Sequence, residues 1–361
     1  MVEPALVTAA DIARLAEVTR GTVSNWRRRH QDFPAPVGGT DASPAYDRAE
    51  VETWLEARGA LPELSAAELL WRAVIGEAEG SDLGLFVEWA AARAVELDRD
   101  QVPPAQSHAA RVGSPELQGA LERAVAAGGA WGTVDTLIDR YADTAGIART
   151  PAPVVRLMGA LAEVSDGAAR SQDAVLDPAA GTGELLGCAA DWSGRVLGQE
   201  LDQALARLAQ IRVPEAEIAT GDSLRADQFA GEMVDVVLCH PPFGDRDWGQ
   251  EELAGDPHWA YGIPPKSEPE LAWVQHALSH LKPGGRAVVL LPPAVASRPS
   301  ARWIRAELVR RGALRAVIAL PSGLARPVHV PVCLWVFQRP ADTIAIDPRV
   351  LFVDVADLEW G

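Results

Sequence analysis

The stretch Ala174-Val175-Leu176-Asp177-Pro178-Ala179-Ala180-Gly181-Thr182-Gly183 decides the fold of this chain. Its first residues are typical of a buried strand, and its glycines indicate a tight turn that opens a helix at about Glu184. Further apolar runs end in polar groups at Gln199-Glu200, Gly221-Asp222 and His240-Pro241-Pro242-Phe243. In open α/β sheets, ligands bind outside the carboxyl ends of the strands. We therefore predict an α/β domain in which these strand ends surround one crevice.

The polar groups at these strand ends fit a nucleoside that carries a carboxylate. Gly181 and Gly183 let the backbone approach a ligand, and the helix start after them favours an anion. Glu200 lies 19 residues after Gly181, where a Rossmann-type acidic residue grips ribose hydroxyls. Asp222 can accept from an adenine amino group. Because the loop lacks the G-x-G-x-x-G spacing of a pyrophosphate site, the set predicts S-adenosylmethionine rather than NAD. The two glycines alone would indicate only a tight turn.

His240-Pro241-Pro242-Phe243 is the most specific short motif of the chain. It follows the apolar run 234–239, and its two prolines fix φ and end the strand. The carbonyls beside them become rigid acceptors, and Phe243 offers a flat face for stacking against a base. The loop is therefore suited to hold a planar amino group. Without the upstream motifs, a strand-ending Pro-Pro turn would be the simpler interpretation.

Together these motifs resemble the N6-adenine DNA methyltransferases of the type I restriction-modification kind, in their modification-subunit form. The resemblance covers roughly residues 146–340. It rests on the segments 146–161, 177–186 (DPAAGTGELL), 199–202, 221–223, 261–265, 270–292 and 304–337. It implies a Rossmann-like class I S-adenosylmethionine-dependent methyltransferase fold.

The resemblance also implies the residues of the site, with Thr150-Pro151 helping to close over the cofactor. The residues expected to bind S-adenosylmethionine are Thr150, Pro151, Asp177, Pro178, Ala179, Gly181, Gly183, Glu200, Leu201, Asp222 and Ser223. The residues expected to act on the target adenine are His240, Pro241, Pro242 and Phe243.

The chain departs from the family pattern at two places. The family has Asn-Pro-Pro-Phe or Asn-Pro-Pro-Tyr, and its Asn accepts a proton from the adenine amino group, whereas this chain has His240. A neutral imidazole has one acceptor nitrogen and can substitute, but a protonated one has none. The neutral form should dominate at neutral pH, since an unperturbed imidazole titrates near ~6.5. The second departure is Ala148-Arg149, where the family often has an aromatic residue.

Residues 1–60 are predicted to form a separate module. Thr8 can cap one helix, with Asp11 three residues later, and Thr19 can cap a second. The segment resembles the winged helix-turn-helix of the MerR and excisionase type, which implies that the second helix enters the major groove. The candidate DNA-binding residues are Arg20, Thr22, Ser24, Asn25, Arg27, Arg28 and Arg29. A protein-interaction module with a solvated arginine face is the alternative.

The rest of the chain divides into three further segments. Residues 61–145 are rich in Ala, Leu and Glu and predict a helical domain, with breaks near Gly80 and Pro103-Pro104. The methyltransferase domain is expected over 146–345. Residues 346–361 form a C-terminal extension of a chain that is either truncated or a short variant. No target-recognition domain is evident, and in the type I family that task usually falls to a separate specificity subunit.

Charge and composition limit the partners. The 361 residues carry a formal net charge of −17, so DNA binding must be local, with Arg27-Arg28-Arg29 as the obvious cluster. Acidity also fits a chain that relies on a basic partner subunit, and a homodimer stays open. The three cysteines and seven histidines show no metal-ligand spacing, so we predict no metal site. Lacking a membrane span or signal pattern, the chain is expected to be soluble and cytoplasmic.

Three functions are consistent with these features. In the first, the enzyme moves a methyl group from S-adenosylmethionine to N6 of a flipped-out adenine in DNA. His240 and the carbonyl of Pro241 would hold the amino group, and Phe243 would stack on the base. In the second, the chain binds cofactor and DNA without turnover, as a regulator or defence component, because His240 replaces Asn. In the third, which the helix-turn-helix disfavours, it methylates a protein amide or a small molecule.

Overall fold

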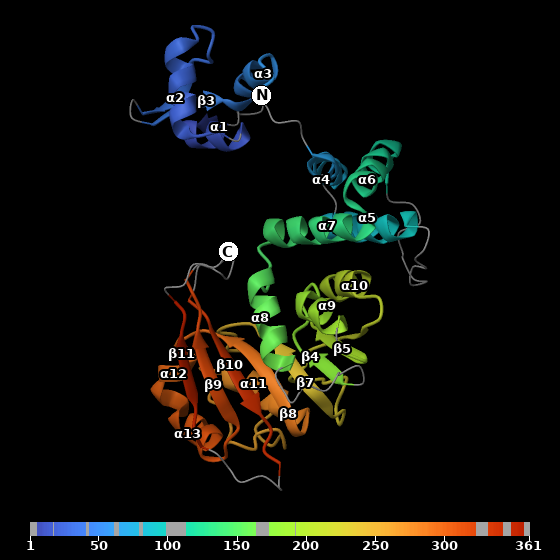
Figure 1. The fold of residues 1–361 in the computed structure, drawn as a ribbon, viewed down its shortest axis with the longest axis vertical. Coiled ribbons are helices and arrows are strands. Elements are labelled where there is room, and N and C mark those ends of the chain that lie inside the picture. Colours follow the sequence, from blue (N-terminus) through green and yellow to red (C-terminus); the bar gives the residue numbers. More distant parts are fainter. Residues whose placement is uncertain are drawn as a thin grey trace. The chain divides into compact units, whose positions relative to one another are not determined.

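The computed structural model describes residues 6–16, 18–40, 43–60, 65–78, 82–98, 113–163, 173–191, 193–322, 331–341 and 348–356. The chain forms two compact units, Met1–Leu69 and Leu70–Gly361 (Figure 1). The helical segment that follows Leu69 therefore packs as one unit with the sheet. The predicted breaks near Gly80 and at Pro103-Pro104 lie outside the described residues.

The first unit combines three helices with a small sheet in the part of it that the structure describes. Its elements are β1 (Leu6–Thr8), α1 (Ala9–Leu15), α2 (Arg20–Arg29), β2 (Pro36–Thr40), β3 (Ser43–Asp47) and α3 (Arg48–Glu56). The strands pair antiparallel in the order β1-β3-β2. The hairpin β2–β3 lies between α2 and α3.

The helices of the first unit start where the sequence predicted caps. The Asp11 carboxylate accepts from the backbone N–H of Thr8 at 2.9 Å and from its hydroxyl at 2.6 Å. The Thr19 hydroxyl accepts from the backbone N–H of Thr22 at 3.2 Å. Because the first N–H groups of a helix have no partner within it, such side-chain bonds fix where α1 and α2 begin. Phe33 packs edge-on against Tyr46 and Trp54 in the apolar core.

The second unit begins with a layer of helices. These are α4 (Ala66–Glu77), whose first residues belong to the first unit, α5 (Leu83–Leu97), α6 (Pro115–Gly128), α7 (Ala130–Ala145) and, after a turn at Gly146, α8 (Ala152–Glu163). Ion pairs fasten this layer to α10 (Gln203–Arg212), where Arg207 contacts Glu88 of α5 at 2.7 Å. The described helices include none that is both long enough and apolar enough to cross a bilayer.

Within the described residues, the second unit has one eight-stranded sheet in the order β11-β9-β10-β8-β7-β4-β5-β6. The strands are β4 (Ala174–Asp177), β5 (Arg195–Glu200), β6 (Glu217–Thr220), β7 (Val234–Cys239), β8 (Leu281–Leu291), β9 (Leu314–Ala319), β10 (Cys333–Gln338) and β11 (Leu351–Asp354). All run parallel except β10, which is antiparallel to β8 and β9. Since β5 follows β4 on one side and β7 lies on the other, β4 and β7 flank the topological switch point where such sheets bind ligands.

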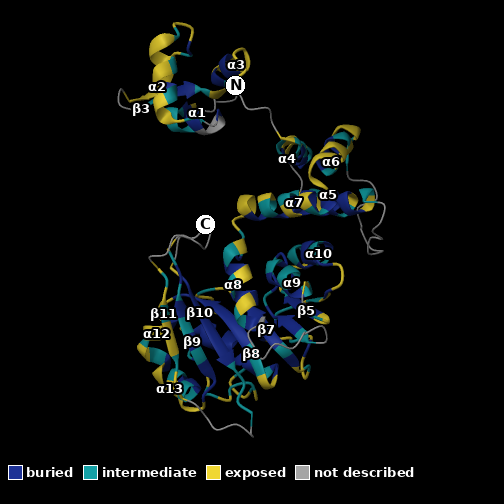
Figure 2. Ribbon diagram, viewed as in Figure 1, coloured by how far each residue is buried: buried dark blue, intermediate teal, exposed yellow. Residues whose placement is uncertain are grey.

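Both faces of the sheet are covered, which explains why its strands are continuously apolar. Val175 and Val236 face the cluster that contains α8 and α9 (Glu184–Ala190), while their neighbours Leu176 and Val237 face the opposite cluster. The opposite cluster includes α11 (Pro269–Ser279) and α13 (Arg302–Arg310). The short helices α12 (Ala294–Ser297) and η1 (Pro299–Ala301) lead into α13. Figure 2 shows the central strands as buried between these layers.

Candidate active site

A cavity of about 570 Å³ opens beyond the carboxyl ends of the parallel strands. Its wall brings together loops that follow β4, β5, β6 and β7. The predicted residues that line it are Pro178, Ala179, Gly181, Glu200, Leu201, Asp222, Ser223, His240, Pro241, Pro242 and Phe243. The volume lies in the range of about 300–1,000 Å³ that is usual for small-molecule sites. The four strand-end motifs therefore share one cavity, as the sequence predicted.

The glycine loop after β4 is shaped by two left-handed backbone positions. Gly181 has φ +55° and Gly183 has φ +87°, a region that other residues adopt only with strain. A Cβ on Gly183 would lie 3.2 Å from the Cα and Cβ of Ala209, so this glycine also lets α10 pack closely. A Cβ on Gly181 would meet no atom within 4 Å. The space over Gly181 is thus open to a ligand, and α9 begins at Glu184 as predicted.

Glu200 stands at the end of β5 and is tied to the glycine loop. Its Oε2 accepts from the backbone N–H of Gly181 at 2.8 Å, and its Oε1 accepts from that of Asp202 at 2.9 Å. Burial raises the pKa of Glu200. Each carboxylate oxygen can accept a second hydrogen bond. Glu200 can therefore receive two adjacent hydroxyl groups while it holds the loop in place.

Asp222, at the end of β6, already has several partners. Its Oδ1 accepts from the backbone N–H groups of Leu224 at 3.0 Å and Arg225 at 3.2 Å, and its Oδ2 accepts from Arg225 at 2.9 Å. A further donor, such as an adenine amino group, would use the remaining lone pair of Oδ2. The Ser223 hydroxyl donates to the carbonyl of Pro178 at 2.6 Å. Ser223 thus joins the loops after β4 and β6.

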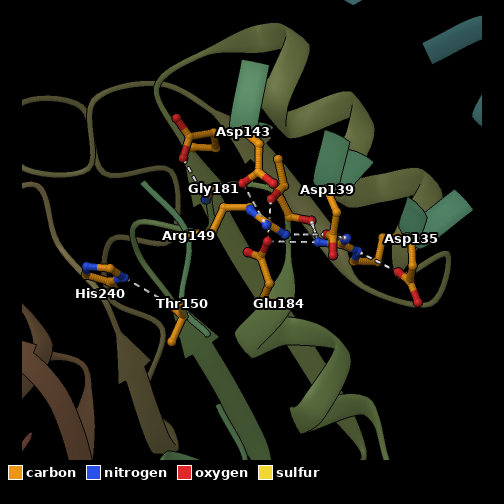
Figure 3. A network of polar contacts seen from close by, with 11 residues as sticks. Asp135, Asp139, Asp143, Arg149, Thr150, Gly181, Glu184 and His240 are labelled. Atoms are coloured by element: carbon orange, nitrogen blue, oxygen red, sulfur yellow. Dashed lines mark hydrogen bonds and ion pairs between the residues drawn. The ribbon is translucent and has the colours of Figure 1, made fainter. Parts of the chain in front are cut away.

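His240 at the end of β7 is a neutral imidazole with a defined neighbour. The Thr150 hydroxyl oxygen lies 2.9 Å from Nδ1 of His240 (Figure 3). Burial lowers the pKa of His240 to about 4, so the ring is uncharged at neutral pH. The Phe243 ring lies beside it, with centroids 5.3 Å apart and planes inclined at 47°. An acceptor nitrogen and an aromatic face therefore meet on the cavity wall.

The direction of the Thr150–His240 hydrogen bond sets what His240 can do. If Nδ1 donates to the threonine hydroxyl, Nε2 presents a lone pair and can accept from an amino group. If the hydroxyl donates to Nδ1, Nε2 carries the proton and only donates. Accepting an amino proton, the role that the family resemblance implies for position 240, requires the first arrangement.

Four of the predicted residues support the cavity without lining it. Thr150 holds His240, Pro151 precedes α8, and Gly183 packs against α10. Asp177 is only 1% exposed, and its Oδ1 accepts from the backbone N–H of Ala179 at 3.0 Å. Burial, together with the carboxylates of Glu200 and Glu184, raises the pKa of Asp177 to about 8. Asp177 therefore supports the glycine loop through its hydrogen bond with the Ala179 backbone.

The sequence analysis did not predict Glu270, a fully buried carboxylate on the cavity wall. Its Oε1 accepts from the backbone N–H of Gly244 at 3.1 Å, and its Oε2 pairs with Arg298 at 2.8 Å. Because Gly244 directly follows Phe243, Glu270 anchors the Pro-Pro-Phe loop to α11. In the sequence, Glu270 appears only as an acidic residue at the start of a mostly apolar segment, 269–279. Trp248, Trp273 and Pro292 complete this wall.

Two arginines make ion pairs with α7, and Figure 3 shows Arg149 beside Asp139 and Asp143 of that helix. Arg149 contacts Asp139 at 2.5 Å and Asp143 at 3.0 Å. Arg212 of α10 contacts Asp139 at 2.9 Å and Glu184, the first residue of α9, at 3.0 Å. Arg149 stands where the related family often has an aromatic residue. Its guanidinium connects the segment that carries Thr150 to the helical layer.

The candidate DNA-binding residues all lie on α2 of the first unit. All are exposed except Thr22, which is half-buried and shares a hydrogen bond with the Thr19 hydroxyl. Arg28 donates to the side-chain oxygen of Asn25 at 2.8 Å and to the carbonyl of Ser24 at 3.3 Å. These two bonds would have to open if Arg28 and Asn25 each contacted a base.

The amino-acid sequence matches a known protein family and two curated relatives. Residues 134–359 match the N-6 DNA Methylase family. The chain is 30% identical over 173 residues to the type I restriction enzyme HindI methylase subunit of Haemophilus influenzae, which is 46% of this chain and 38% of that protein. It is 26% identical over 229 residues to the MjaIX methylase subunit of Methanocaldococcus jannaschii, 58% of this chain and 40% of that protein. The chain thus spans about two fifths of these curated relatives.

Solved structures share the fold at low sequence identity. The methyltransferase subunit of a type I restriction-modification system from Streptococcus thermophilus has a TM-score of 0.61 and 21% identity, covering 97% of this chain and 80% of that one. A protein from Listeria monocytogenes, described as a class I S-adenosylmethionine-dependent methyltransferase, has a TM-score of 0.60 and 16% identity, covering 81% and 93%. These likenesses confirm the predicted Rossmann-like α/β methyltransferase fold.

Proposed function

This chain belongs to the N-6 DNA methylase family, and from that premise we propose that it transfers a methyl group from S-adenosylmethionine to the N6 amino group of adenine in DNA. One observation carries the proposal. The loop from His240 to Phe243 lies on the same cavity as Glu200 and the open face of Gly181. A nucleoside held at Glu200 and a planar base held at His240 would therefore share one enclosed space.

The residues on the cavity wall fit the cofactor. Glu200 would accept from the two ribose hydroxyls through the lone pairs that Gly181 and Asp202 leave free. Asp222 would accept from the adenine amino group, and Leu201 and Leu224 supply apolar surface. When bound, S-adenosylmethionine supplies an electrophilic methyl group on a positively charged sulfur. The chain itself provides the position and the dry surroundings.

The target adenine would be held by the loop after β7. Its amino group would donate one hydrogen bond to Nε2 of His240 and one to the carbonyl of Pro241, with Phe243 stacked on the ring. With both N–H groups donating hydrogen bonds, the nitrogen lone pair would be directed at the methyl group for in-line transfer. As the N–C bond formed, the bond from sulfur to the methyl group would break, S-adenosylhomocysteine would leave, and the amino nitrogen would lose one proton to solvent. Because the reacting atom lies inside a duplex, the base must be flipped out to reach this loop.

The low pKa of His240 keeps the ring in the neutral form that the proposed turnover requires. A ring with a pKa of about 4 keeps its acceptor nitrogen at neutral pH, which is the property that an Asn at this position provides. The discriminating variants are His240→Ala, expected to lower the rate at least a hundredfold, and His240→Asn, expected to lower it less. A sharp rise in activity for His240→Asn would instead favour a native protein that binds without turnover.

DNA and a separate specificity subunit are the proposed partners, since the relatives are methylase subunits of type I restriction enzymes. We propose that residues 1–60 act as a winged helix-turn-helix and add local DNA contacts through α2, because the chain as a whole is strongly acidic.

Residues 61–145 would serve as a helical domain and 146–345 as the methyltransferase domain. Residues 346–361 would extend that domain, and β11 adds a parallel strand beside β9. A cytoplasmic location follows from this substrate, and a homodimer is a further proposal.

A methyl-transfer assay tests the proposal. The protein is incubated with S-adenosylmethionine labelled on its methyl group and with mixed-sequence DNA free of N6-methyladenine. Calorimetry with the same cofactor runs alongside, with Glu200→Ala as the variant expected to lose cofactor binding. We expect label in N6-methyladenine for the native chain. If cofactor binds but no label enters DNA above background, the result counts against methyl transfer by this chain. If cofactor does not bind either, the proposal is wrong.

A further inference from the structure

A buried cluster of two histidines and an aspartate lies behind the cavity wall. His276 is on α11, His280 directly follows that helix, and Asp227 lies between β6 and β7. One ligand atom from each residue lies within 4.8 Å of the other two. Both imidazoles are only 2% exposed. Trp273 links this cluster to the cavity, since it lines the cavity and packs edge-on against His276 at a centroid distance of 6.2 Å.

The facing atoms of the cluster lack hydrogen-bond partners among the residues that the structure describes. These atoms are Oδ2 of Asp227, Nε2 of His276 and Nε2 of His280, and all three are buried. An unpaired buried polar atom costs about 1–3 kcal/mol. The other such atoms in the described residues are indole nitrogens of Trp54, Trp248 and Trp335, which do not lie together in one cluster with these three atoms. Three such atoms in one place indicate a shared partner that satisfies them together.

The backbone holds His280 in the tautomer that binds metals. Its Nδ1 lies 3.0 Å from the carbonyl oxygen of Glu232, so Nδ1 carries the proton and donates. Nε2 then presents a lone pair, and it lies 3.1 Å from Oδ2 of Asp227, which is also an acceptor. Two acceptors at that distance repel each other unless a proton or a metal ion lies between them. Metal-binding histidines commonly donate their other ring N–H to a backbone carbonyl in this way.

A plain ion pair explains the cluster less well. A doubly protonated His280 would attract Asp227, but the two facing atoms do not have the alignment of a hydrogen bond. An ion pair would also leave Nε2 of His276 buried without a partner. A metal ion uses all three atoms at once.

We propose that Asp227, His276 and His280 bind one divalent transition-metal ion, with zinc as the expected ion. Imidazole nitrogens and carboxylate oxygens bind zinc at about 2.0–2.2 Å, which places tetrahedral ligands ~3.3 Å apart. The 3.1 Å between His280 and Asp227 already matches this spacing. The other ligand atoms lie within 4.8 Å and would have to approach by side-chain rotation when the ion binds. Our sequence analysis predicted no metal site. However, His280 lies four residues after His276, about one helical turn, and this spacing is usual for a pair of metal ligands.

The ion would have a structural role at the active site. It would join α11, which carries Glu270 and Trp273, to the loop that begins with Asp222 and Ser223. Both segments line the cavity, so the ion would fix the distance between the wall for the cofactor and the wall for the target base.

The test measures metal content in the full chain, purified without a polyhistidine tag. After loading with zinc chloride and dialysis against a weak chelator, we expect about one zinc ion per native chain by elemental analysis. The double variant His276→Gln, His280→Gln should retain less than about a fifth of that amount. His30→Gln, a histidine of the first unit, is the matched control and should bind as the native chain does. Zinc should raise the native thermal midpoint by roughly 5 °C.

Two results would overturn the proposal. One is a native chain that retains less than about a tenth of a zinc ion after loading. The other is a double variant that retains zinc as fully as the native chain. If the double variant fails to fold, X-ray absorption of the zinc-loaded native chain gives the answer. Two imidazoles and otherwise oxygen ligands support the site, whereas sulfur ligands or fewer than two imidazoles exclude it.

Discussion

The hydroxyl oxygen of Thr150 lies 2.9 Å from Nδ1 of His240, a residue 90 positions later in the chain. The bond fixes the orientation of the imidazole on the cavity wall. If Nδ1 donates to this oxygen, Nε2 faces the target base as an acceptor. A threonine expected to close over the cofactor thus also serves as a positioning residue for the residue that replaces the family's asparagine.

Replacing Thr150 tests this arrangement. Thr150→Val keeps the shape but cannot accept from Nδ1, so we expect kcat to fall about tenfold, the effect of one hydrogen bond of ~1.4 kcal/mol. Thr150→Ser keeps the hydroxyl and should stay within about threefold of the native rate. The KM for S-adenosylmethionine should hardly change in either variant. A large rise in that KM with kcat unchanged would show that Thr150 acts on the cofactor instead.

The pH dependence of stability reports on His240. Its pKa is lowered to about 4 in the fold, so between about pH 6.5 and 4 the unfolded chain binds a proton that the folded chain does not. The contribution of His240 to the free energy of unfolding is therefore fully present above pH 6.5. It decreases by roughly 1–3 kcal/mol as the pH falls toward 4. Urea unfolding of the native chain and His240→Asn across this range should show the variant losing less. If the free energy of unfolding changes with pH equally in the two proteins, the pKa of His240 is not lowered in the folded chain.

The glycine loop offers a matched pair of substitutions. Gly183→Ala places a Cβ at φ +87° and 3.2 Å from Ala209, so we expect a loss of about 1–3 kcal/mol in the free energy of unfolding. Gly187 lies within α9, where a Cβ would meet Val213 at an ordinary 3.7 Å. Gly187→Ala should therefore be neutral or stabilise by up to ~1 kcal/mol. If denaturant unfolding shows the same change in the free energy of unfolding for both substitutions, the left-handed backbone and close packing of Gly183 do not matter for stability.

Glu270 should matter for both stability and turnover. Glu270→Gln retains an acceptor for Gly244 but removes the charge that pairs with Arg298, and we expect a loss of about 2–4 kcal/mol in stability. Activity of the folded fraction should fall because the Pro-Pro-Phe loop loses its anchor. Glu251→Gln changes an exposed carboxylate later in the chain and serves as the control. Native activity in the folded Glu270→Gln protein would show that the anchor is dispensable.

Contact between α2 and DNA would appear in the salt dependence of binding. Arg27→Ala with Arg29→Ala removes two exposed charges, so the slope of log affinity against log salt should decrease by about 2 for duplex DNA. Arg48→Ala removes an arginine of the same unit that pairs with Glu52 and should leave the slope unchanged. An unchanged slope in the double variant would favour a protein-interaction role for this helix.

The amino-acid sequence by itself determined the fold and the place of the cavity. Alternating residues such as Val175 and Leu176 face opposite helical layers, so buried strands are recognisable from local hydrophobicity alone. Strand ends are equally local, because the glycines near Gly181 and the prolines after His240 stop the strands at fixed positions. Parallel strands place their carboxyl ends on one edge, which is why motifs far apart in sequence could be assigned to one site.

Only the tertiary structure decided which polar groups meet. Thr150 contacts His240, which lies 90 residues later in the chain. Glu270 of α11 accepts from the loop residue Gly244, and Asp227 lies beside His280 although β7 and α11 separate them in the sequence. Such contacts depend on strand order and on which helix covers which face of the sheet. Apolar burial requires only the right side of an element, whereas a hydrogen bond or a metal ligand requires a position correct to a few tenths of an ångström. That position is set when the whole sheet and its covering helices have formed.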